Sequence, residues 1–555
     1  MAAAIPFVRA ICLVATVLLF GAGCATQGRY TGGDAAATKE RLAVAEAALA
    51  EAKRLRSSDV RRAVGFYLTA AQECLPLVIE GGEDSRAGTY YNEACAEITR
   101  LVHGLGSGVS GLGLRCPGAG KEYRLVLAEG KKFAELNRYN TLRSSKSSRL
   151  KRKSRKSLGQ TGVGGALVGT IKPNGSGLRG GISPEGMVVP LASIVTFPGE
   201  GEALLQVFLV GREDDVDLLG RQLKLAADFS APLSTLGPQR RPEKTKWGAT
   251  LHPEQFEHRK GLHLTEPFSA TKIPVVLVHG FFSSPRTWRR SYLALIKDEQ
   301  IRENYQFWIF EYPSGYGLAR NMRSLRRALD ETLDQYDPGR TTPVSKQMVM
   351  VGHSMGGLLA SAMIRSSGDE VWDAMFQSPI DQLDVSAETR EELRELTYFT
   401  ARPEISRVIF IATPHRGSRM TVKPLGRLAG ALIEIPANLI RLQPPGLIEN
   451  LRNGKDIWFA ENDTSIETMR PNSWQLELLR SLPMKKGVTY HSIIGDRGKG
   501  PGPKCSDGIV DYTSTHIDGA ASELLVPSGH LAQKNPKGHA EIIRILREHL
   551  RSVGR

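Results

Sequence analysis

Residues 348–359 read MVMVGHSMGGLL, an apolar run that ends in Gly-x-Ser-x-Gly and passes directly into a helix-forming sequence. This order predicts a strand, one sharp turn and a helix, with Ser354 at the tip of the turn. Gly352 and Gly356 flank the serine because side chains at these positions would collide where the strand and the helix approach each other. The pattern is that of a nucleophile elbow, which presents a serine hydroxyl above the edge of a sheet.

The first amide after the turn has a predicted role as well. Met355 opens the helix, so its backbone N–H is directed at the oxygen that becomes negative when Ser354 attacks a carbonyl group. This N–H would supply one half of an oxyanion hole. Gly-x-Ser-x-Gly alone occurs by chance in many proteins, and the flanking strand and helix make the interpretation more specific.

Length and charge set limits on the rest of the chain. At 555 residues the chain is too long for one hydrophobic core, and two or three domains are expected. The formal net charge is +15, but seven of the basic residues fall in the serine-rich run 146–156, and without them it would be +8. We interpret this run as a solvated loop, with binding of anionic lipid head groups as the alternative. Nucleic acid is not an expected partner, because no recognition motif accompanies the charge.

The first 24 residues are expected to be a signal peptide. Arg9 precedes an apolar run over 10–20, which is shorter than the roughly 20 residues needed to cross a bilayer. The segment ends like a bacterial lipobox, in which the cysteine, here Cys24, is acylated and becomes the mature N-terminus. Gly21 stands where that pattern usually has Leu, and the alternative is an ordinary signal peptide cleaved nearby. With Ala25 next, and no acidic residue there, the resemblance implies a lipoprotein on the periplasmic side of the outer membrane.

Residues 25–104 are expected to hold a short tether and a helical hairpin. Residues 39–79 place apolar side chains at helical spacing, a glycine pair follows, and 86–102 predicts a second helix. Cys74 and Cys95 lie almost symmetrically about the turn. In an exported protein they form either a disulfide or two small buried thiols.

Residues 105–253 consist of short apolar runs separated by glycine and proline, which are typical of strands in a small antiparallel β domain. No pattern in this region indicates chemistry. The predicted strands lie at 123–127, 166–171, 187–197 and 204–210.

Residues 254–555 alternate apolar runs with helical segments. Continuous apolar runs are expected of strands buried on both faces of a parallel sheet. The alternation predicts a doubly wound α/β domain with its active residues on loops at the carboxyl ends of the strands. The predicted strands lie at 273–281, 307–310, 347–351, 408–412, 490–494 and 523–526, and the helices near 288–298, 322–336, 356–365 and 540–550.

Five motifs of this domain follow the order found in bacterial α/β-hydrolase lipases and esterases. They are VHGF at 278–281, GHSMGG at 352–357, TPHRGS at 413–418, SDGIV at 506–510 and SGH at 528–530. On these residues the chain resembles that superfamily, close to proteobacterial lipoprotein hydrolases and to the GPI inositol-deacylase-like branch. The match covers about 272–555 and implies an α/β-hydrolase domain.

The resemblance also implies roles for particular residues. Phe281 matches the residue whose backbone N–H completes the oxyanion hole with that of Met355. Asp507 and His530 match the acid and the base of a catalytic triad with Ser354, which needs neither a metal nor a cofactor. Three further histidines match positions that shape loops, namely His279, His353 and His415.

Other residues compete for the roles of acid and base. Triads of this fold run serine, acid, histidine along the chain, so the base follows the acid. His530 is favoured because it directly follows the last predicted strand, on a loop from which its imidazole can reach Ser354. Asp507 is favoured because it lies in a turn ahead of an apolar pair. The rivals are His516, His539 and His549 for the base and Asp496 and Asp511 for the acid.

Two long segments, 367–403 and 419–483, have no place in the minimal fold and stand where lipases carry cap or lid elements. The apolar clusters at 432–435 and 439–440 favour a lid over a lipid-like acyl chain. The alternative is a structural insertion that only covers the sheet.

The leading functional hypothesis is a membrane-anchored serine hydrolase that cleaves carboxylic esters, with lipids as the expected substrates, through an acyl-enzyme on Ser354. One alternative is an acyltransferase, because it would use the same nucleophile, base and oxyanion hole. Another is a non-catalytic interaction protein of the cell envelope on a hydrolase scaffold. The sequence leaves open the natural ester and the role of the first 253 residues.

Overall fold

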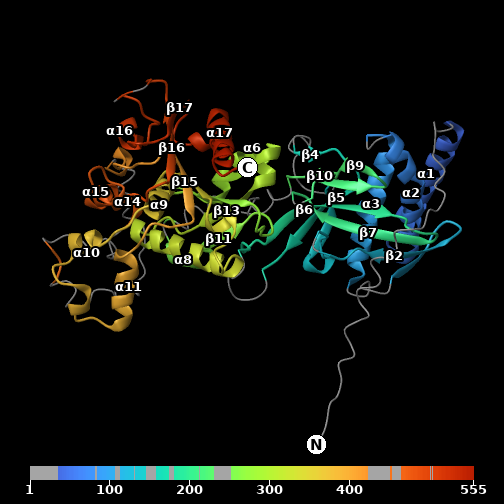
Figure 1. Cartoon of the computed structure of the whole chain (residues 1–555), viewed down its shortest axis with the longest axis horizontal. Coiled ribbons are helices and arrows are strands. Elements are labelled where there is room, and N and C mark those ends of the chain that lie inside the picture. The colour runs from blue at the N-terminus through green and yellow to red at the C-terminus, as the bar shows by residue number, and fades with distance from the viewer. Residues whose placement is uncertain are drawn as a thin grey trace, which may run out of the picture.

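The computed structural model of the chain contains two units that lie side by side along its long axis (Figure 1). It describes residues 35–81, 84–106, 113–130, 132–145, 158–173, 181–211, 213–230, 250, 252–422, 450–452, 464–500, 502 and 504–555. Three predicted features lie outside these residues: the signal peptide with Cys24, the basic run 146–156, and the apolar clusters within 432–440. Among the described helices, none combines the length and apolarity needed to cross a bilayer.

The chain begins with three helices where the sequence predicted two, namely α1 (Ala35–Leu55), α2 (Val60–Gly81) and α3 (Arg86–Gly104). The helix expected over 39–79 is interrupted before Val60. The Asp59 carboxylate accepts a hydrogen bond from the backbone N–H of Arg62 at 3.1 Å and so caps the start of α2. Because the apolar spacing on both sides of the break is helical, the spacing alone did not reveal it.

Cys74 in α2 and Cys95 in α3 are buried free thiols, which is the second of the two alternatives for this pair. Burial raises the pKa of each thiol to about 12. At neutral pH both are protonated and behave as small apolar side chains. Cys116 and Cys505 are also buried and free.

The helices cover a six-stranded sheet with the strand order β1-β2-β7-β6-β5-β3. All four predicted strands are present, but β2 and β7 pair in parallel, so the sheet is mixed rather than antiparallel. The strands are β1 (Leu114–Pro117), β2 (Glu122–Leu127), β3 (Thr141–Ser144), β5 (Gly165–Ile171), β6 (Met187–Thr196) and β7 (Glu202–Leu209), and the small pairs are β4 (Gly159–Gln160) with β10 (Ala227–Asp228) and β8 (Asp215–Leu218) with β9 (Arg221–Lys224).

Helix α3 packs so closely on this sheet that helices and strands share one core. A Cβ at Gly165 would overlap the backbone of Ala96, which explains the glycine at the start of β5. The Tyr91 hydroxyl donates to the carbonyl of Val195 at 2.7 Å, across the same contact. The helical and β-rich segments therefore form one N-terminal α+β unit.

The predicted doubly wound α/β domain follows and is confirmed. Its seven-stranded sheet has the order β11-β13-β12-β14-β15-β16-β17, and all pairs are parallel except the one made by the edge strand β11. The strands are β11 (Gly261–Leu264), β12 (Ile273–Val278), β13 (Tyr305–Glu311), β14 (Met348–His353), β15 (Ile405–Ile411), β16 (Thr489–Asp496) and β17 (Ser522–Pro527).

Helices lie on both sides of this sheet, and the four that the sequence predicted are present (Figure 1). Strand β11 was missed, because four residues that include a histidine make too short a pattern. The longer helices are α6 (Arg289–Leu295), α8 (Leu318–Tyr336), α9 (Met355–Met363), α11 (Ala387–Thr397), α15 (Trp474–Ser481) and α17 (Pro536–Ser552), and the short ones are α7 (Glu299–Asn304), α10 (Glu370–Met375), α14 (Ser465–Thr468) and α16 (Tyr512–Thr515).

The first insertion, 367–403, folds into α10 and α11. The guanidinium of Arg323 in α8 bonds to the carboxylates of Glu392 and Glu395 in α11, at 2.5 and 2.7 Å. This helix therefore packs on α8 in the helical layer, which favours the structural alternative for the first insertion.

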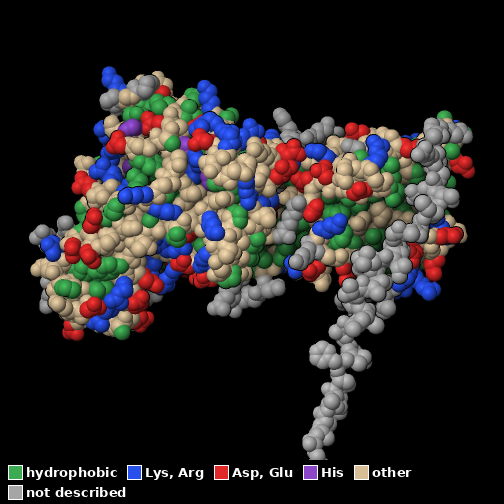
Figure 2. Space-filling model, in the orientation of Figure 1, with side chains coloured by type: hydrophobic (Ala, Val, Ile, Leu, Met, Phe, Trp, Pro, Cys, Tyr) green, Lys and Arg blue, Asp and Glu red, His purple; other side chains and the backbone are tan. Residues whose placement is uncertain are grey.

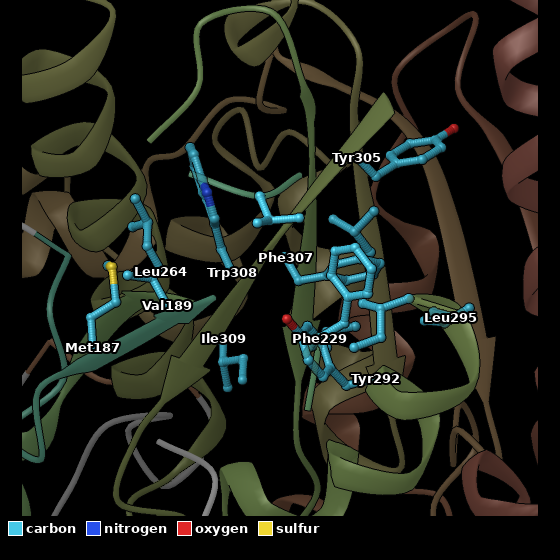
Figure 3. Packing of buried hydrophobic residues seen from close by; sticks show 14 of the residues in the cluster. Met187, Val189, Phe229, Leu264, Tyr292, Leu295, Tyr305, Phe307, Trp308 and Ile309 are labelled. Atoms are coloured by element: carbon cyan, nitrogen blue, oxygen red, sulfur yellow. The ribbon is translucent and has the colours of Figure 1, made fainter. Parts of the chain in front are cut away.

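The two units meet through an apolar contact at the β13 side of the α/β sheet. Figure 3 shows Phe229 of the N-terminal unit beside Tyr292 and Phe307. The guanidinium of Arg302 lies 4.2 Å from the centre of the Phe229 ring, and it pairs with Asp214 at 3.6 Å. The contact therefore combines apolar packing with a buried ion pair.

We expect His549, at the back of the sheet, to make folding stability depend on pH. Burial lowers its pKa from 6.5 to about 4, so the folded protein binds a proton less readily than the unfolded chain. The contribution of neutral His549 to the free energy of unfolding is complete above pH 6.5. It is lost as the pH falls toward 4, by at most about 1.4 kcal/mol per pH unit. In urea unfolding at pH 7.0, 5.5 and 4.5, His549→Gln should lose less stability than the wild type on acidification. His258→Gln, at an exposed histidine, is the control, and equal acid losses in wild type and His549→Gln would contradict the expectation.

Candidate active site

Ser354 stands on a strained turn between β14 and α9. Its backbone has φ 54° and ψ −126°, a conformation that residues other than glycine rarely adopt. A Cβ at Gly352 would overlap the carbonyl oxygen of Gly356, and a Cβ at Gly356 would overlap the carbonyls of Val278 and His279 in the neighbouring strand and loop. The two glycines are therefore required by the close approach of strand and helix, as the sequence predicted.

The structure brings Ser354, His530 and Asp507 together in the order of a triad. The Ser354 hydroxyl lies 2.9 Å from Nε2 of His530, and Nδ1 of His530 lies 2.8 Å from Oδ2 of Asp507. Ser354 is 7% exposed and Asp507 is 1% exposed. The serine follows β14, the acid lies in the loop after β16, and the histidine follows β17, so all three occupy the carboxyl edge of the sheet.

The Asp507 carboxylate is fixed by its own turn. Its Oδ1 accepts hydrogen bonds from the backbone N–H groups of Ile509 and Val510, each at 2.7 Å. Only Oδ2 is then left for the imidazole, and it holds the proton of His530 on Nδ1. Nε2 is thereby free to accept the proton of the Ser354 hydroxyl.

The rival residues are bound elsewhere, and none contacts Ser354. His516 pairs with Glu523 at 2.7 Å, and His539 bonds to the carbonyl of Gln533 at 2.9 Å. His549 lies between Tyr305 and Ser406. Of the rival acids, Asp496 accepts hydrogen bonds from the backbone of its own loop, and Asp511 pairs with Arg419 at 3.0 Å.

The residues of the predicted oxyanion hole lie next to groups that adjoin Ser354. The position of a Cβ on Gly280 is 2.9 Å from Cβ of Ser354, so the loop that carries Phe281 passes directly over the serine. Met355 is the first residue of α9, where a backbone N–H has no partner within the helix. Among the described residues, neither the N–H of Phe281 nor that of Met355 donates to another group. Both can therefore bind an oxyanion.

Two residues that sequence reasoning missed hold the loop of Phe281. The Tyr312 hydroxyl donates to the carbonyl of His279 at 2.6 Å, and its ring stacks on the His279 ring at 4.3 Å. The Ser314 hydroxyl accepts from the N–H of Phe282 at 3.3 Å, where the backbone has a φ of 53°. Tyr312 and Ser314 follow β13, and their position at a carboxyl strand end is the signal that could have indicated them.

The three motif histidines are buried and neutral. Burial lowers the pKa of His279 to about 4 and that of His415 to about 3. Burial also lowers the pKa of His353 well below its usual value, and Nε2 of His353 lies 2.8 Å from the carbonyl oxygen of His530. That hydrogen bond ties the serine turn to the histidine loop. Among the described residues, no group of His, Cys, Asp and Glu could hold a metal ion.

Comparison with known proteins agrees with this architecture. The sequence profile of the alpha/beta hydrolase family matches residues 275–538, which include all three members of the triad. No curated protein matches the sequence. The second half of the chain therefore has the α/β-hydrolase fold.

Solved structures that part of the chain resembles include lipases and esterases. The mature lipase BlEst2 of Bacillus licheniformis is 14% identical, over 51% of this chain and 97% of that chain, with a TM-score of 0.31. Lipase 1 of Pelosinus fermentans is 13% identical, over 50% and 98%, with a TM-score of 0.32. Esterase B of Lactobacillus rhamnosis is 15% identical, over 52% and 79%, with a TM-score of 0.29.

We expect a comparison of His530→Ala with His539→Ala to identify the base. Only His530 reaches Ser354, so His530→Ala should lower kcat for a p-nitrophenyl ester by about 10³-fold or more, and His539→Ala by less than about threefold. Asp507→Asn should also be impaired, because the amide no longer selects the required tautomer. Circular dichroism of all three variants checks the fold. Full activity of His530→Ala with loss in His539→Ala would place the base on the other loop.

Proposed function

We propose that this protein is a serine hydrolase that cleaves carboxylic esters. The observation that carries the proposal is the chain of contacts from the Ser354 hydroxyl through His530 to Asp507, at 2.9 and 2.8 Å. A buried carboxylate, a histidine and a serine on a strained turn are the parts needed to make a hydroxyl nucleophilic. The alpha/beta hydrolase match over 275–538 supports the same class.

The first half of the reaction forms an acyl-enzyme. His530 takes the proton of the Ser354 hydroxyl on Nε2 as the oxygen attacks the ester carbonyl. The N–H groups of Phe281 and Met355 stabilise the oxyanion, a contribution of about 3 kcal/mol per donor in comparable sites. The tetrahedral intermediate collapses when the C–O bond to the alcohol breaks and His530 gives its proton to the leaving oxygen.

The second half returns the serine. A water molecule gives a proton to Nε2 of His530 and attacks the acyl carbonyl, and the carboxylic acid leaves as the proton returns to Ser354. Throughout, the Asp507 carboxylate stabilises the imidazolium without taking its proton. An acceptor alcohol in place of water would make the same site an acyltransferase.

We further propose that the acyl group is lipid-like. Leu531, directly after His530, is 48% exposed, an unusual position for a leucine in the described part of the chain. The segment 419–483 carries apolar clusters in its sequence, as expected of a lid over an acyl chain. A panel of p-nitrophenyl esters should show rising kcat/KM with chain length beyond four carbons, and a preference for acetyl esters would contradict the proposal.

Ser354 should be the residue that reacts with a fluorophosphonate probe. The wild type should be labelled, and peptide mass spectrometry should locate the adduct on Ser354. Ser354→Ala should abolish labelling and lower kcat by about 10³-fold to 10⁶-fold with the fold intact. Ser481→Ala, at an exposed serine, is the matched control. Ester hydrolysis retained by a clean Ser354→Ala preparation, or a wild type that does not react, would contradict the proposal.

Anchoring at Cys24 is a separate proposal, and the lipobox-like end of the signal peptide supports it. If Cys24 is acylated, the full-length protein should partition into the detergent phase of Triton X-114. Cys24→Ser should move it to the aqueous phase or leave the signal peptide uncleaved, with esterase activity unchanged. An unmodified mature N-terminus at another residue, found by mass spectrometry, would overturn the proposal.

A further inference from the structure

Two arginines that follow the oxyanion loop have no carboxylate partner within the described part of the chain. Arg286 and Arg289 are half-buried and follow Phe281 by five and eight residues. The Nη1 atom of Arg286 is fully buried and makes no hydrogen bond. Among the described residues, neither side chain has a hydrogen bond or an ion pair with a carboxylate. Burial and the Arg289 guanidinium both lower the pKa of Arg286.

More deeply buried arginines elsewhere in the molecule have partners for other nitrogens of the guanidinium, although Nε of Arg302, Arg326 and Arg407 is also without one among the described residues. Arg302, Arg402 and Arg407 each pair with at least one carboxylate. Arg326 and Arg365 lack a carboxylate but donate to backbone carbonyls. A buried guanidinium nitrogen needs such a partner, and Nη1 of Arg286 has none among the described residues, so the pair at 286 and 289 can accept an anion.

The helical segment that carries the pair is tied to the loop of His530. Nε2 of Gln533 donates to the hydroxyl of Thr287 at 2.9 Å, and the Ser291 hydroxyl donates to the carbonyl of Gln533 at 2.6 Å. Gln533 follows His530 by three residues. On the other side, five residues of chain from Phe281 span at most about 18 Å, which bounds the separation of Arg286 from the oxyanion hole.

Positive charge continues around this region. Lys534 is near enough to help lower the pKa of His353 beside the triad. Figure 2 shows Lys and Arg side chains on the surface over α6 and α17.

We propose that Arg286 and Arg289 bind a phosphate group of the substrate, so that the enzyme acts on acyl esters that carry a phosphate, as glycerophospholipids do. Two guanidinium groups suit a phosphate, whose several oxygens can accept hydrogen bonds from both, whereas a carboxylate is satisfied by one. The inference rests on the proposed ester hydrolysis at Ser354 and specifies its substrate.

The test compares two soluble esters below their micelle concentrations, dibutyryl glycerol phosphate and dibutyryl glycerol. Wild type should prefer the phosphate ester in kcat/KM. Arg286→Gln should lower kcat/KM for that ester by about 10-fold to 100-fold, mainly through KM, and leave dibutyryl glycerol unchanged. Arg289→Gln should act in the same direction, and Arg286→Lys should restore part of the loss. Arg551→Gln, at an exposed arginine of α17, is the control for loss of surface charge.

Binding gives a readout that does not need catalysis. Titration calorimetry with the Ser354→Ala variant should detect binding of dibutyryl glycerol phosphate. In the double variant that also carries Arg286→Gln, this binding should be weaker by at least about 10-fold. Inorganic phosphate should bind more weakly than the ester, and equal affinity would indicate a site for free phosphate and overturn the substrate assignment.

Three other results would overturn the proposal. They are an equal loss on both esters, binding unaffected by Arg286→Gln, and an effect of Arg286→Gln that appears only with micelles, which would mean that the arginines bind a lipid surface. Failure of the proposed hydrolysis is distinguishable, because it removes fluorophosphonate labelling and turnover of both esters while phosphate-dependent binding persists.

Discussion

The hydrogen bond between His530 and Ser354 joins residues that lie 176 positions apart in the chain, and the rest of the active domain serves to hold it. Parallel strands place the carboxyl ends of β14, β16 and β17 at one edge, which brings a serine, an acid and a histidine from three loops together. The His353 bond to the His530 carbonyl adds a direct brace between two of those loops. A neutral, buried histidine suits this task, because it donates one hydrogen bond without adding charge beside the base.

Much of this arrangement could be predicted because it is encoded locally. Gly352 and Gly356 flank Ser354 because the strand and the helix approach too closely for side chains at these positions. Buried parallel strands are continuous apolar runs, so each can be recognised in the sequence without knowing which strand it pairs with. The roles of Asp507 and His530 were indicated by the resemblance to α/β-hydrolase motifs, and the place of His530 directly after the last predicted strand agrees with its role. Their roles in catalysis remain predictions, which the geometry supports.

Features that depend on pairing between distant segments could not be predicted in this way. The sequences of β2 and β7 do not indicate that the two strands pair in parallel. The place of β11 at the edge of the sheet depends on its pairing with β13. The break before Val60 rests on one capping carboxylate inside an otherwise helical pattern. Tyr312 and Ser314 support the oxyanion loop through single hydrogen bonds, and neither belongs to a motif.

The contact of Arg302 with Phe229 joins the N-terminal unit to the α/β domain. Helices α1 to α3 lie at the far end of the molecule from β17 and α9, beside which the triad lies (Figure 1). A partner bound to those helices would therefore influence the direction in which the carboxyl edge of the α/β sheet faces. Orientation toward a large substrate, rather than any change in the triad, is what such a partner would control.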